Sequence, residues 1–238
     1  MALVPHNLNQ IAVRETREGA AALSADLQNR IDRIWDEIQK TRNTPMANEP
    51  LFAVMRIEGN EVYGHFVEYK WFVAQSHDPG LFQDLQIRPL AVSGILSCPE
   101  GIVLGRRSAN VTQNPSAWEL VPSGGVDKSS VKEGGVVDLN AQILSELKEE
   151  IGLPASAVEN VRCVGLIEDT DHHLFDAAME VKTAWRAGDI FESFRRAEND
   201  EYSEIQIMPA AKADTLLGQP NQDLVPLSAF LIQRMRRA

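Results

Sequence analysis

Three glutamates crowd the C-terminal end of one predicted helix. Glu146, Glu149 and Glu150 stand at positions i, i+3 and i+4, a spacing that places them on one face of a helix. Their mutual repulsion and the helix dipole oppose this arrangement, each by about 0.2–1 kcal/mol. A divalent cation turns that repulsion into binding, because Mg²⁺ takes oxygen ligands from a few carboxylates and keeps water positions for substrate phosphates. The pattern predicts either a metal site or a solvated acidic face.

A strand that ends in two glycines comes before this helix. Residues 120–126 read Leu-Val-Pro-Ser-Gly-Gly-Val. Glycine lets backbone carbonyls and amides approach a metal or a phosphate closely. A glycine pair alone usually marks a tight turn, whereas a glycine pair followed by an acidic helix is a more specific combination. We therefore expect Gly124 and Gly125 to share a site with the three glutamates.

An apolar stripe and a stop signal define the helix that carries the glutamates. Gly152 stands where a helix C′ residue is expected, and Pro154 prevents the helix from continuing. The apolar residues that recur every four positions are Leu139, Ile143, Leu147 and Ile151. The helix is therefore predicted to end near residue 151, with the glutamates in its last turns.

Residues 125–153 resemble the Nudix box, in which a glycine precedes a closing motif Arg-Glu-apolar-x-Glu-Glu-x-Gly-apolar. The matching positions are Gly125, Glu146, Leu147, Glu149, Glu150, Gly152 and Leu153. The first glycine and the first closing glutamate lie 146 − 125 = 21 positions apart, whereas the family pattern has fifteen. Ser145 replaces the box arginine, and Val137 replaces the first box glutamate. In the family these two positions support the loop-helix-loop structure, so the resemblance implies a rebuilt loop with a retained metal face.

The resemblance implies a metal-dependent hydrolase. Mg²⁺ or Mn²⁺ would be held by Glu146, Glu149, Glu150 and the Gly124 carbonyl, and the same glutamates would form the catalytic centre. Gly125 is expected at the bound substrate. The implied reaction is hydrolysis of the diphosphate in a nucleoside diphosphate linked to another moiety, with a small-molecule nucleotide as the partner.

The pattern along the rest of the chain indicates an α+β fold. Residues 20–40 have helical spacing of apolar residues, 41–50 read as a linker, and 51–74 read as two strands around Gly59 and Asn60. Further strands are predicted within 91–108, 118–121, 161–170, 172–185 and 203–209, with a closing helix at 221–237. Together with the resemblance, this order predicts a Nudix-type α/β/α sandwich with a mixed sheet over residues 91–238. Residues 1–90 are predicted to be an N-terminal helix and β extension.

Two arginines and two further glutamates are additional candidates for this site. Arg106 and Arg107 end a predicted strand, and guanidinium groups match phosphate oxygens in pairs, although an exposed strand end explains them equally well. Glu201 and Glu204 lie just before or within the strand at 203–209. Nudix enzymes often place another metal-binding or base carboxylate there. Glu146, Glu201 and Glu204 are therefore all candidates for orienting or deprotonating the attacking water.

The substrate is suggested only by a second, looser resemblance. Residues 48–72 are similar to the leading segment of a Nudix subgroup with UDP-sugar pyrophosphatase activity. This favours a nucleoside diphosphate sugar. The open alternatives are ADP-ribose, a dinucleotide or a nucleoside triphosphate as substrate, or a catalytically silenced Nudix domain that senses a nucleotide.

The composition of the chain indicates its cellular location and the classes of partner that it lacks. The 238 residues contain 23 Lys and Arg against 34 Asp and Glu, a net charge of −11, which disfavours a protein that wraps nucleic acid. No apolar run approaches the roughly 20 residues of a membrane span, and the first residues lack the layout of a signal peptide. Cys98 and Cys163 make no disulfide framework. We expect a cytoplasmic protein without nucleic acid or membrane partners, and a homodimer stays open.

Overall fold

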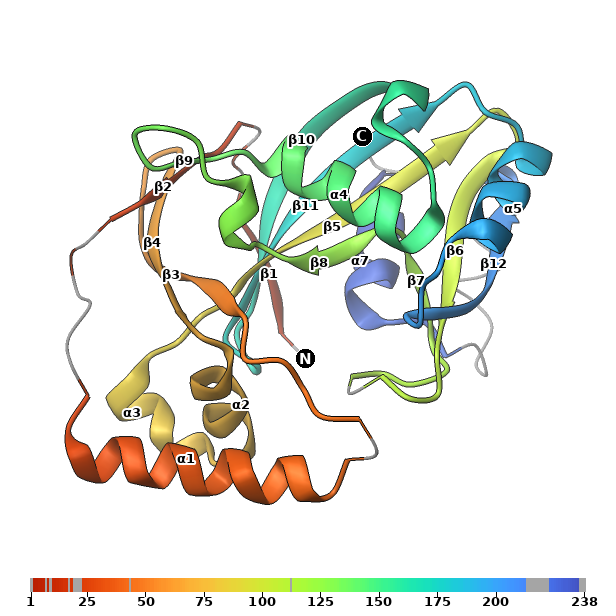
Figure 1. Cartoon of the computed structure of the whole chain (residues 1–238). Coiled ribbons are helices and arrows are strands. Elements are labelled where there is room, and N and C mark those ends of the chain that lie inside the picture. The colour runs from red at the N-terminus through yellow and green to blue at the C-terminus, as the bar shows by residue number, and fades with distance from the viewer. Residues whose placement is uncertain are drawn as a thin grey trace.

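The computed structural model describes residues 2–6, 8, 10–16, 18, 23–42, 44–111, 113–212 and 223–235. Figure 1 shows a large twisted sheet with helices on both faces, above a smaller part formed mainly by the N-terminal third of the chain. Within the described residues, one sheet follows the order β1-β10-β11-β5-β6-β12, with β7 beside β6 and β8 beside β5. A second sheet follows the order β3-β4-β2-β9. The predicted α+β class is confirmed.

The large sheet is mixed, as predicted. β11 runs parallel to β5, and the other pairings in this sheet are antiparallel. Its strands are β1 (Leu3–His6), β5 (Leu90–Cys98), β6 (Gly101–Arg107), β7 (Trp118–Leu120), β8 (Ser123–Gly125), β10 (Val158–Asp169), β11 (Leu174–Thr183) and β12 (Tyr202–Met208).

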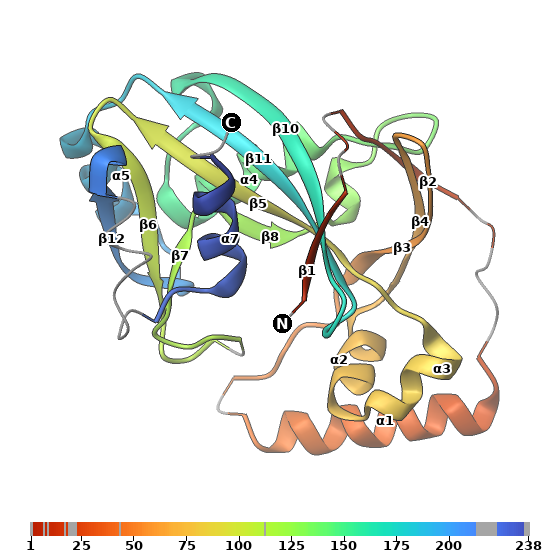
Figure 2. The ribbon, with the colours of Figure 1, turned by 180° about the vertical axis from the view of Figure 1, so that it is seen from behind.

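Two apolar layers hold the helices against this sheet. On one face Val92 and Leu96 of β5 pack in one cluster with α4 (Leu139–Ile151) and α5 (Ala187–Arg196). On the other face Ile95 packs in a second cluster with α7 (Pro226–Met235). Alternate residues of one strand therefore serve opposite layers, as the two-residue period of a strand requires. Figure 2, which views the molecule from behind, shows α7 on this second face.

The smaller part combines the second sheet with three helices. Its strands are β2 (Ala12–Glu15), β3 (Pro50–Glu58), β4 (Glu61–Glu68) and β9 (Val136–Val137), and its helices are α1 (Ala25–Lys40), α2 (Tyr69–His77) and α3 (Phe82–Leu85). The chain crosses between the two sheets four times, from β1 to β2, from β4 to β5, from β8 to β9 and from β9 to β10. The domain boundary at residue 90 stays a prediction.

Residues 69–74 were predicted as strand and are helical, so that prediction is wrong. Tyr69, Trp71 and Val73 alternate in sequence, yet they lie in α2. Asn48 accepts a hydrogen bond from the Lys70 backbone amide at 2.9 Å through its side-chain oxygen, which satisfies one amide of the first helical turn. This contact comes from 22 positions away, and local β propensity cannot reveal it.

The terminal helices agree with prediction within the described residues. The helix predicted at 20–40 is α1, which begins at Ala25 after its N-cap Ser24. The helix predicted at 221–237 is α7, and residues 221, 222, 236 and 237 lie outside the described part. The structure also contains α5, β1 and β2, which were not predicted. No helix in the described part of the chain is long and apolar enough to cross a membrane.

Candidate functional site

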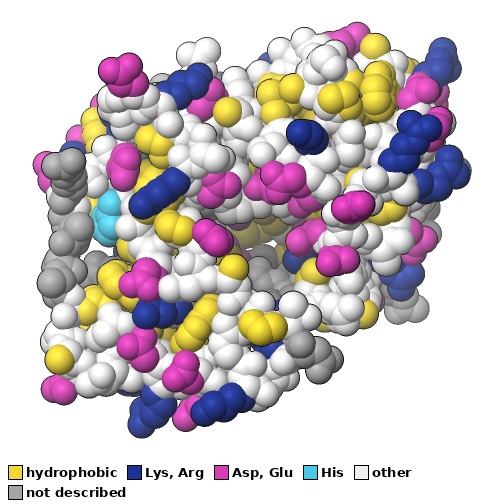
Figure 3. All heavy atoms as spheres, viewed as in Figure 1, with side chains coloured by type: hydrophobic (Ala, Val, Ile, Leu, Met, Phe, Trp, Pro, Cys, Tyr) yellow, Lys and Arg dark blue, Asp and Glu magenta, His cyan; other side chains and the backbone are white. Residues whose placement is uncertain are grey.

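A cavity of about 1470 Å³ lies where the large sheet splits. β5 and β6 pair with each other only beside their turn, and further along β5 pairs with β8 while β6 pairs with β7. Residues from β5, β8, β11, α4 and α7 line the cavity, together with residues at the start of β3 and of α2. The end of β6, the loop that follows it, β7 and the segment leading into β12 also contribute to the lining. Figure 3 shows acidic side chains around the hollow between the two parts of the molecule.

Helix α4 is capped at both ends by its own sequence. The Asp138 carboxylate accepts hydrogen bonds from the Asn140 and Ala141 amides at 3.0 and 3.1 Å. Gly152 adopts φ 75° at the C-terminus, and a Cβ at this residue would lie 2.8 Å from the Ser193 carbonyl oxygen. The predicted role of Gly152 as the residue that ends the helix is confirmed. These caps fix the last turns of α4, and thus the glutamates, against β8.

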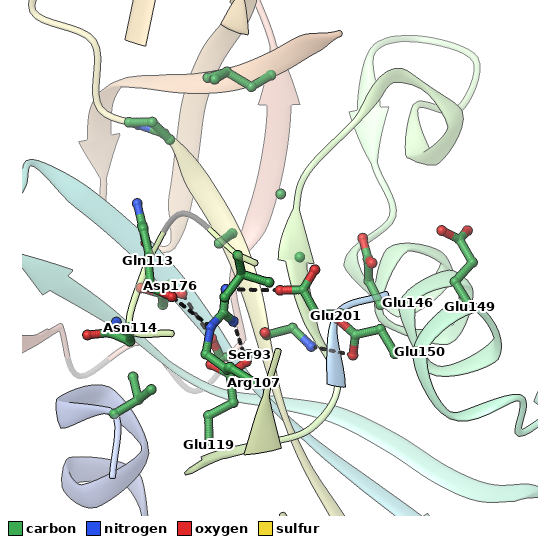
Figure 4. Close-up of a pocket in the computed structure, with 18 of the residues that line it drawn as sticks. Ser93, Arg107, Gln113, Asn114, Glu119, Glu146, Glu149, Glu150, Asp176 and Glu201 are labelled. Carbon is green, nitrogen blue, oxygen red and sulfur yellow. Dashed lines mark hydrogen bonds and ion pairs between the residues drawn. The ribbon is translucent and has the colours of Figure 1, made fainter. Parts of the chain in front are cut away.

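Two of the three glutamates reach across to β8. The Glu150 side chain is 5% exposed and accepts a hydrogen bond from the Ser123 amide at 3.1 Å. Glu146 accepts a hydrogen bond from the side-chain amide of Gln142 at 2.8 Å, and its carboxylate lies directly against Gly124. Glu149 is exposed and accepts a hydrogen bond from the Ser145 hydroxyl at 2.9 Å. Figure 4 shows Glu146 and Glu150 facing the cavity, with Glu149 further out.

Burial makes the charged forms of two glutamates unfavourable. Burial raises the pKa of Glu146 to about 7, and the negative charges of Glu149, Asp127 and Glu201 act in the same direction. Burial also raises the pKa of Glu150 well above its ordinary value, with help from the charge of Glu146. A positive charge beside these two carboxyl groups would favour their ionised forms and oppose both shifts.

The donor set at β8 fits a hard divalent cation. Glu150 supplies buried carboxylate oxygens and Glu146 half-buried ones. Gly124 leaves room that a side chain would fill, because a Cβ there would lie 2.2 Å from the Glu146 carboxyl carbon. Oxygen donors of this type are those that Mg²⁺ and Mn²⁺ prefer. Among the described residues, however, no three His, Cys, Asp or Glu side chains already converge on one point. Each glutamate is instead hydrogen-bonded within the protein.

Arg107 lines the cavity and is held by two carboxylates. Its guanidinium forms ion pairs with Glu119 and, at 2.9 Å, with Glu201, and its side chain is only 12% exposed. Tyr202 donates a second hydrogen bond to Glu119 at 2.8 Å. The result is a buried network that fixes Glu201 at the cavity wall, on the side facing α4 (Figure 4).

Arg106 and Glu204 lie outside the cavity. They pair with each other at 3.0 Å on adjacent strands, and both side chains are about half exposed. Arg106 and Arg107 are consecutive in β6, so their side chains point to opposite faces. The structure therefore brings together Glu146, Glu149, Glu150, Gly124, Gly125, Arg107 and Glu201, all of which line the cavity, and leaves Arg106 and Glu204 apart.

Sequence reasoning missed several polar residues of the cavity. Glu119 follows Trp118 in a short strand, and Asp176 interrupts the apolar run of β11. Ser93 sits in the equally apolar β5. A carboxylate within an otherwise buried strand was the available signal, because acids are rarely buried without a partner or a function.

Glutamine at position 146 is expected to stabilise the metal-free protein at alkaline pH. Glu146 has a folded pKa of about 7 against an ordinary value of 4.5, so the folded state holds the proton more tightly. Its favourable contribution is complete below pH 4.5 and is lost as the pH rises through 7. We expect Glu146→Gln to raise the free energy of unfolding at pH 8 by about 1–3 kcal/mol and to change it little at pH 5.

Urea denaturation with EDTA at the two pH values measures this effect. The control is Glu149→Gln on the exposed face, for which we expect a change within about 0.5 kcal/mol at either pH. An equal gain for Glu146→Gln at pH 5 and pH 8 would show that something other than the buried charge is responsible.

Comparison with known proteins gives matches only at the level of structure. No protein-family model matches the sequence, and no curated protein sequence matches it. DR0079 from Deinococcus radiodurans has 16% identity and a TM-score of 0.49, covering 78% of this chain and 98% of its own. The NUDIX domain of Shewanella oneidensis NrtR, solved with ADP ribose, has 13% identity and a TM-score of 0.48, covering 67% and 97%. A MutT protein from Methanosarcina mazei has 18% identity and a TM-score of 0.42, covering 63% and 94%.

Solved structures similar to this chain thus include Nudix proteins, the class that residues 125–153 resemble. At these identities the likeness concerns the fold alone. Assignment of a reaction depends on the residues of the cavity.

Proposed function

We propose that this protein is a Nudix-type hydrolase that uses Mg²⁺ or Mn²⁺ to cleave the diphosphate of a nucleoside diphosphate linked to another moiety. The observation that carries the proposal is the arrangement at β8, where Glu146 and Glu150 enter a large cavity beside Gly124. The Nudix-like spacing of these residues supports the same assignment.

The cation would be held by Glu146 and Glu150, with Glu149 and the Gly124 carbonyl as further ligands. When bound, it neutralises diphosphate charge and lowers the pKa of a bound water. The Gln142 side-chain amide orients the Glu146 carboxylate, and the Ser123 backbone amide orients that of Glu150. Glu201, held by Arg107, is placed to accept a proton from the attacking water or to orient it. Arg107 itself presents a guanidinium at the cavity wall, where it can bind a phosphate oxygen.

Glu201 is a better candidate than Glu204 for the role beside the water. Glu201 lines the cavity, and its charge contributes to the raised pKa values of Glu146 and Glu150. Glu204 is bonded to Arg106 outside the cavity. The same comparison favours Arg107 over Arg106 for phosphate binding.

A small diphosphate suits this cavity better than a polymer. Attraction for a polyanion must be local, since the chain carries a net charge of −11 and a long nucleic acid would meet that surface along its length. A nucleoside diphosphate sugar is our preferred substrate because of the leading segment's similarity to UDP-sugar pyrophosphatases. ADP-ribose is the main competing substrate. Cytoplasmic location and a homodimer remain predictions.

The sensor alternative is less consistent with the buried acids. A silenced site has no use for two carboxyl groups whose pKa values are raised by burial and by nearby negative charges. Such crowding is unfavourable without a cation, so selection for nucleotide binding alone does not explain it. Ser145, which stands in place of the box arginine, donates a hydrogen bond to Glu149 and so helps to hold this glutamate side chain in place.

A substrate panel tests the proposal. UDP-glucose, UDP-galactose, ADP-ribose, a dinucleotide and nucleoside triphosphates are incubated with Mg²⁺ or Mn²⁺, and products are identified by mass spectrometry. We expect hydrolysis of UDP-sugars to UMP and sugar 1-phosphate. A much higher kcat/KM for ADP-ribose would make ADP-ribose the assigned substrate in place of a UDP-sugar and would leave the proposed diphosphate hydrolysis unchanged. Absence of hydrolysis together with calorimetric nucleotide binding would favour the sensor.

A further inference from the structure

A hydrogen-bonded serine–aspartate pair lies in the cavity, apart from the glutamates of α4. The Ser93 hydroxyl of β5 donates to the Asp176 carboxylate of β11 at 2.9 Å. The two strands run parallel side by side, with Asp176 opposite Ala91, so both side chains lie on the same face of the sheet. Both residues line the cavity (Figure 4).

This pair has spare hydrogen-bond acceptors and no cation. An ionised carboxylate has about four acceptor positions, and Ser93 occupies one of them. Within the described residues, no arginine, lysine or histidine forms an ion pair with Asp176. Burial raises the pKa of Asp176 to about 6, and the charges of Asp169 and Glu119 add to this effect. The site therefore accepts donors and repels anions.

The glutamates of α4 and the Ser93–Asp176 pair suit two different parts of a substrate. Metal ligands at β8 and the guanidinium of Arg107 suit the diphosphate. The carboxylate of Asp176 cannot contact phosphate oxygens favourably, because both are negative acceptors. It suits a neutral group with adjacent hydrogen-bond donors, and vicinal hydroxyls can bond both oxygens of one carboxylate. A half-buried acceptor of this kind discriminates between ligands, since a ligand without donors leaves it unpaired.

We propose that Ser93 and Asp176 form a subsite that binds vicinal hydroxyls of the sugar attached to the nucleoside diphosphate. The proposal rests on the proposed function and adds a specificity-determining pair to it. Ser93 positions the carboxylate by occupying one acceptor position of one oxygen, and the remaining acceptor positions of the two oxygens serve the ligand. The same chemistry serves a hexose in a UDP-sugar and the terminal ribose of ADP-ribose.

Equilibrium binding of non-hydrolysable ligands tests the subsite without relying on turnover. The ligands are the α,β-methylene analogues of UDP-glucose and UDP, and of ADP-ribose and ADP, titrated by calorimetry with Mg²⁺ present. In each pair, the ratio of the two dissociation constants measures the contribution of the sugar. We expect wild type to bind at least one sugar-bearing ligand about tenfold more tightly than its partner, and Asp176→Asn and Ser93→Ala to reduce that ratio below about threefold. The pair that responds identifies the source of the hydroxyls.

Matched controls lie on the same strands outside the cavity. Glu180→Gln on β11 removes a carboxylate that pairs with Arg162, and Ser97→Ala on β5 removes a hydroxyl that bonds the Val181 carbonyl. Both should keep the wild-type ratio. Ser93→Ala, which removes no charge, provides the test if Asp176→Asn does not fold.

The remaining outcomes separate the two proposals. An unchanged ratio in Asp176→Asn and Ser93→Ala, with tight wild-type binding, overturns the subsite and leaves the hydrolase intact. An equal loss of affinity for both members of a pair overturns the sugar assignment, because the carboxylate then contacts the nucleoside. If wild type binds none of the four ligands, the proposed function fails and the subsite fails with it.

Discussion

Glu150→Gln is expected to lower kcat for the best diphosphate substrate by at least about 1000-fold, which corresponds to about 4 kcal/mol in the activation barrier. Glutamine has nearly the same shape as glutamate and can still accept the hydrogen bond from the Ser123 amide. It lacks the negative charge that a divalent cation requires. Because Glu150 is 5% exposed, water cannot easily replace the missing ligand oxygen.

The loss should appear in metal binding as well as in turnover. Mg²⁺ or Mn²⁺ should raise the melting temperature of wild type in a concentration-dependent way and should not raise that of Glu150→Gln. Without metal the variant should be at least as stable as wild type, because folding no longer has to bury or protonate a carboxylate that has negative neighbours. This combination distinguishes a lost ligand from a damaged fold.

The control for this experiment is Glu192→Gln. Glu192 is an exposed glutamate of α5 that pairs with Arg196 one helical turn later. It should keep wild-type turnover and the wild-type response to metal. If Glu150→Gln hydrolyses the substrate within tenfold of wild type, the metal-binding glutamates of the proposed mechanism are wrongly assigned.

Local signals in the sequence were enough to predict the end of the site where α4 meets β8. Helix α4 has its apolar stripe, its acidic face and its stop signal within 16 residues, from Leu139 to Pro154. The glycine pair that β8 brings beside it is also close in sequence. Short-range patterns of this kind depend on helix geometry and backbone sterics, which do not change with tertiary context.

The opposite end of the site could not be predicted from local patterns. Ser93 and Asp176 are 83 positions apart and meet only because β5 and β11 are parallel neighbours in the sheet. The same limitation applies to Arg106 and Arg107, since the choice between them depends on which face of β6 borders the cavity. The prediction of a strand at residues 69–74 failed for a related reason. Asn48, from a distant part of the chain, stabilises the first turn of α2.

Gly124→Ala is expected to reduce kcat/KM by at least about 100-fold, or about 2.7 kcal/mol, while leaving the fold nearly intact. The backbone at Gly124 is not in the left-handed region, so alanine causes no conformational strain there. Its Cβ, however, would lie 2.2 Å from the carboxyl carbon of Glu146. The end of a glutamate side chain can rotate away, so the carboxylate moves and the protein still folds. Glu146 then no longer occupies the position beside β8 that the proposed cation requires.

The adjacent glycine supplies the comparison that makes this prediction specific. A Cβ at Gly125 would meet no atom within 4 Å, and Gly125 pairs with Ala91 in the same short strand in which Gly124 pairs with Val92. We therefore expect Gly125→Ala to lose less than about tenfold in kcat/KM, and both variants to melt within a few degrees of wild type without metal. The increase in melting temperature caused by Mg²⁺ should be lost in Gly124→Ala and retained in Gly125→Ala. Equal losses of activity in the two variants would mean that β8 contributes its backbone to the substrate rather than space for Glu146.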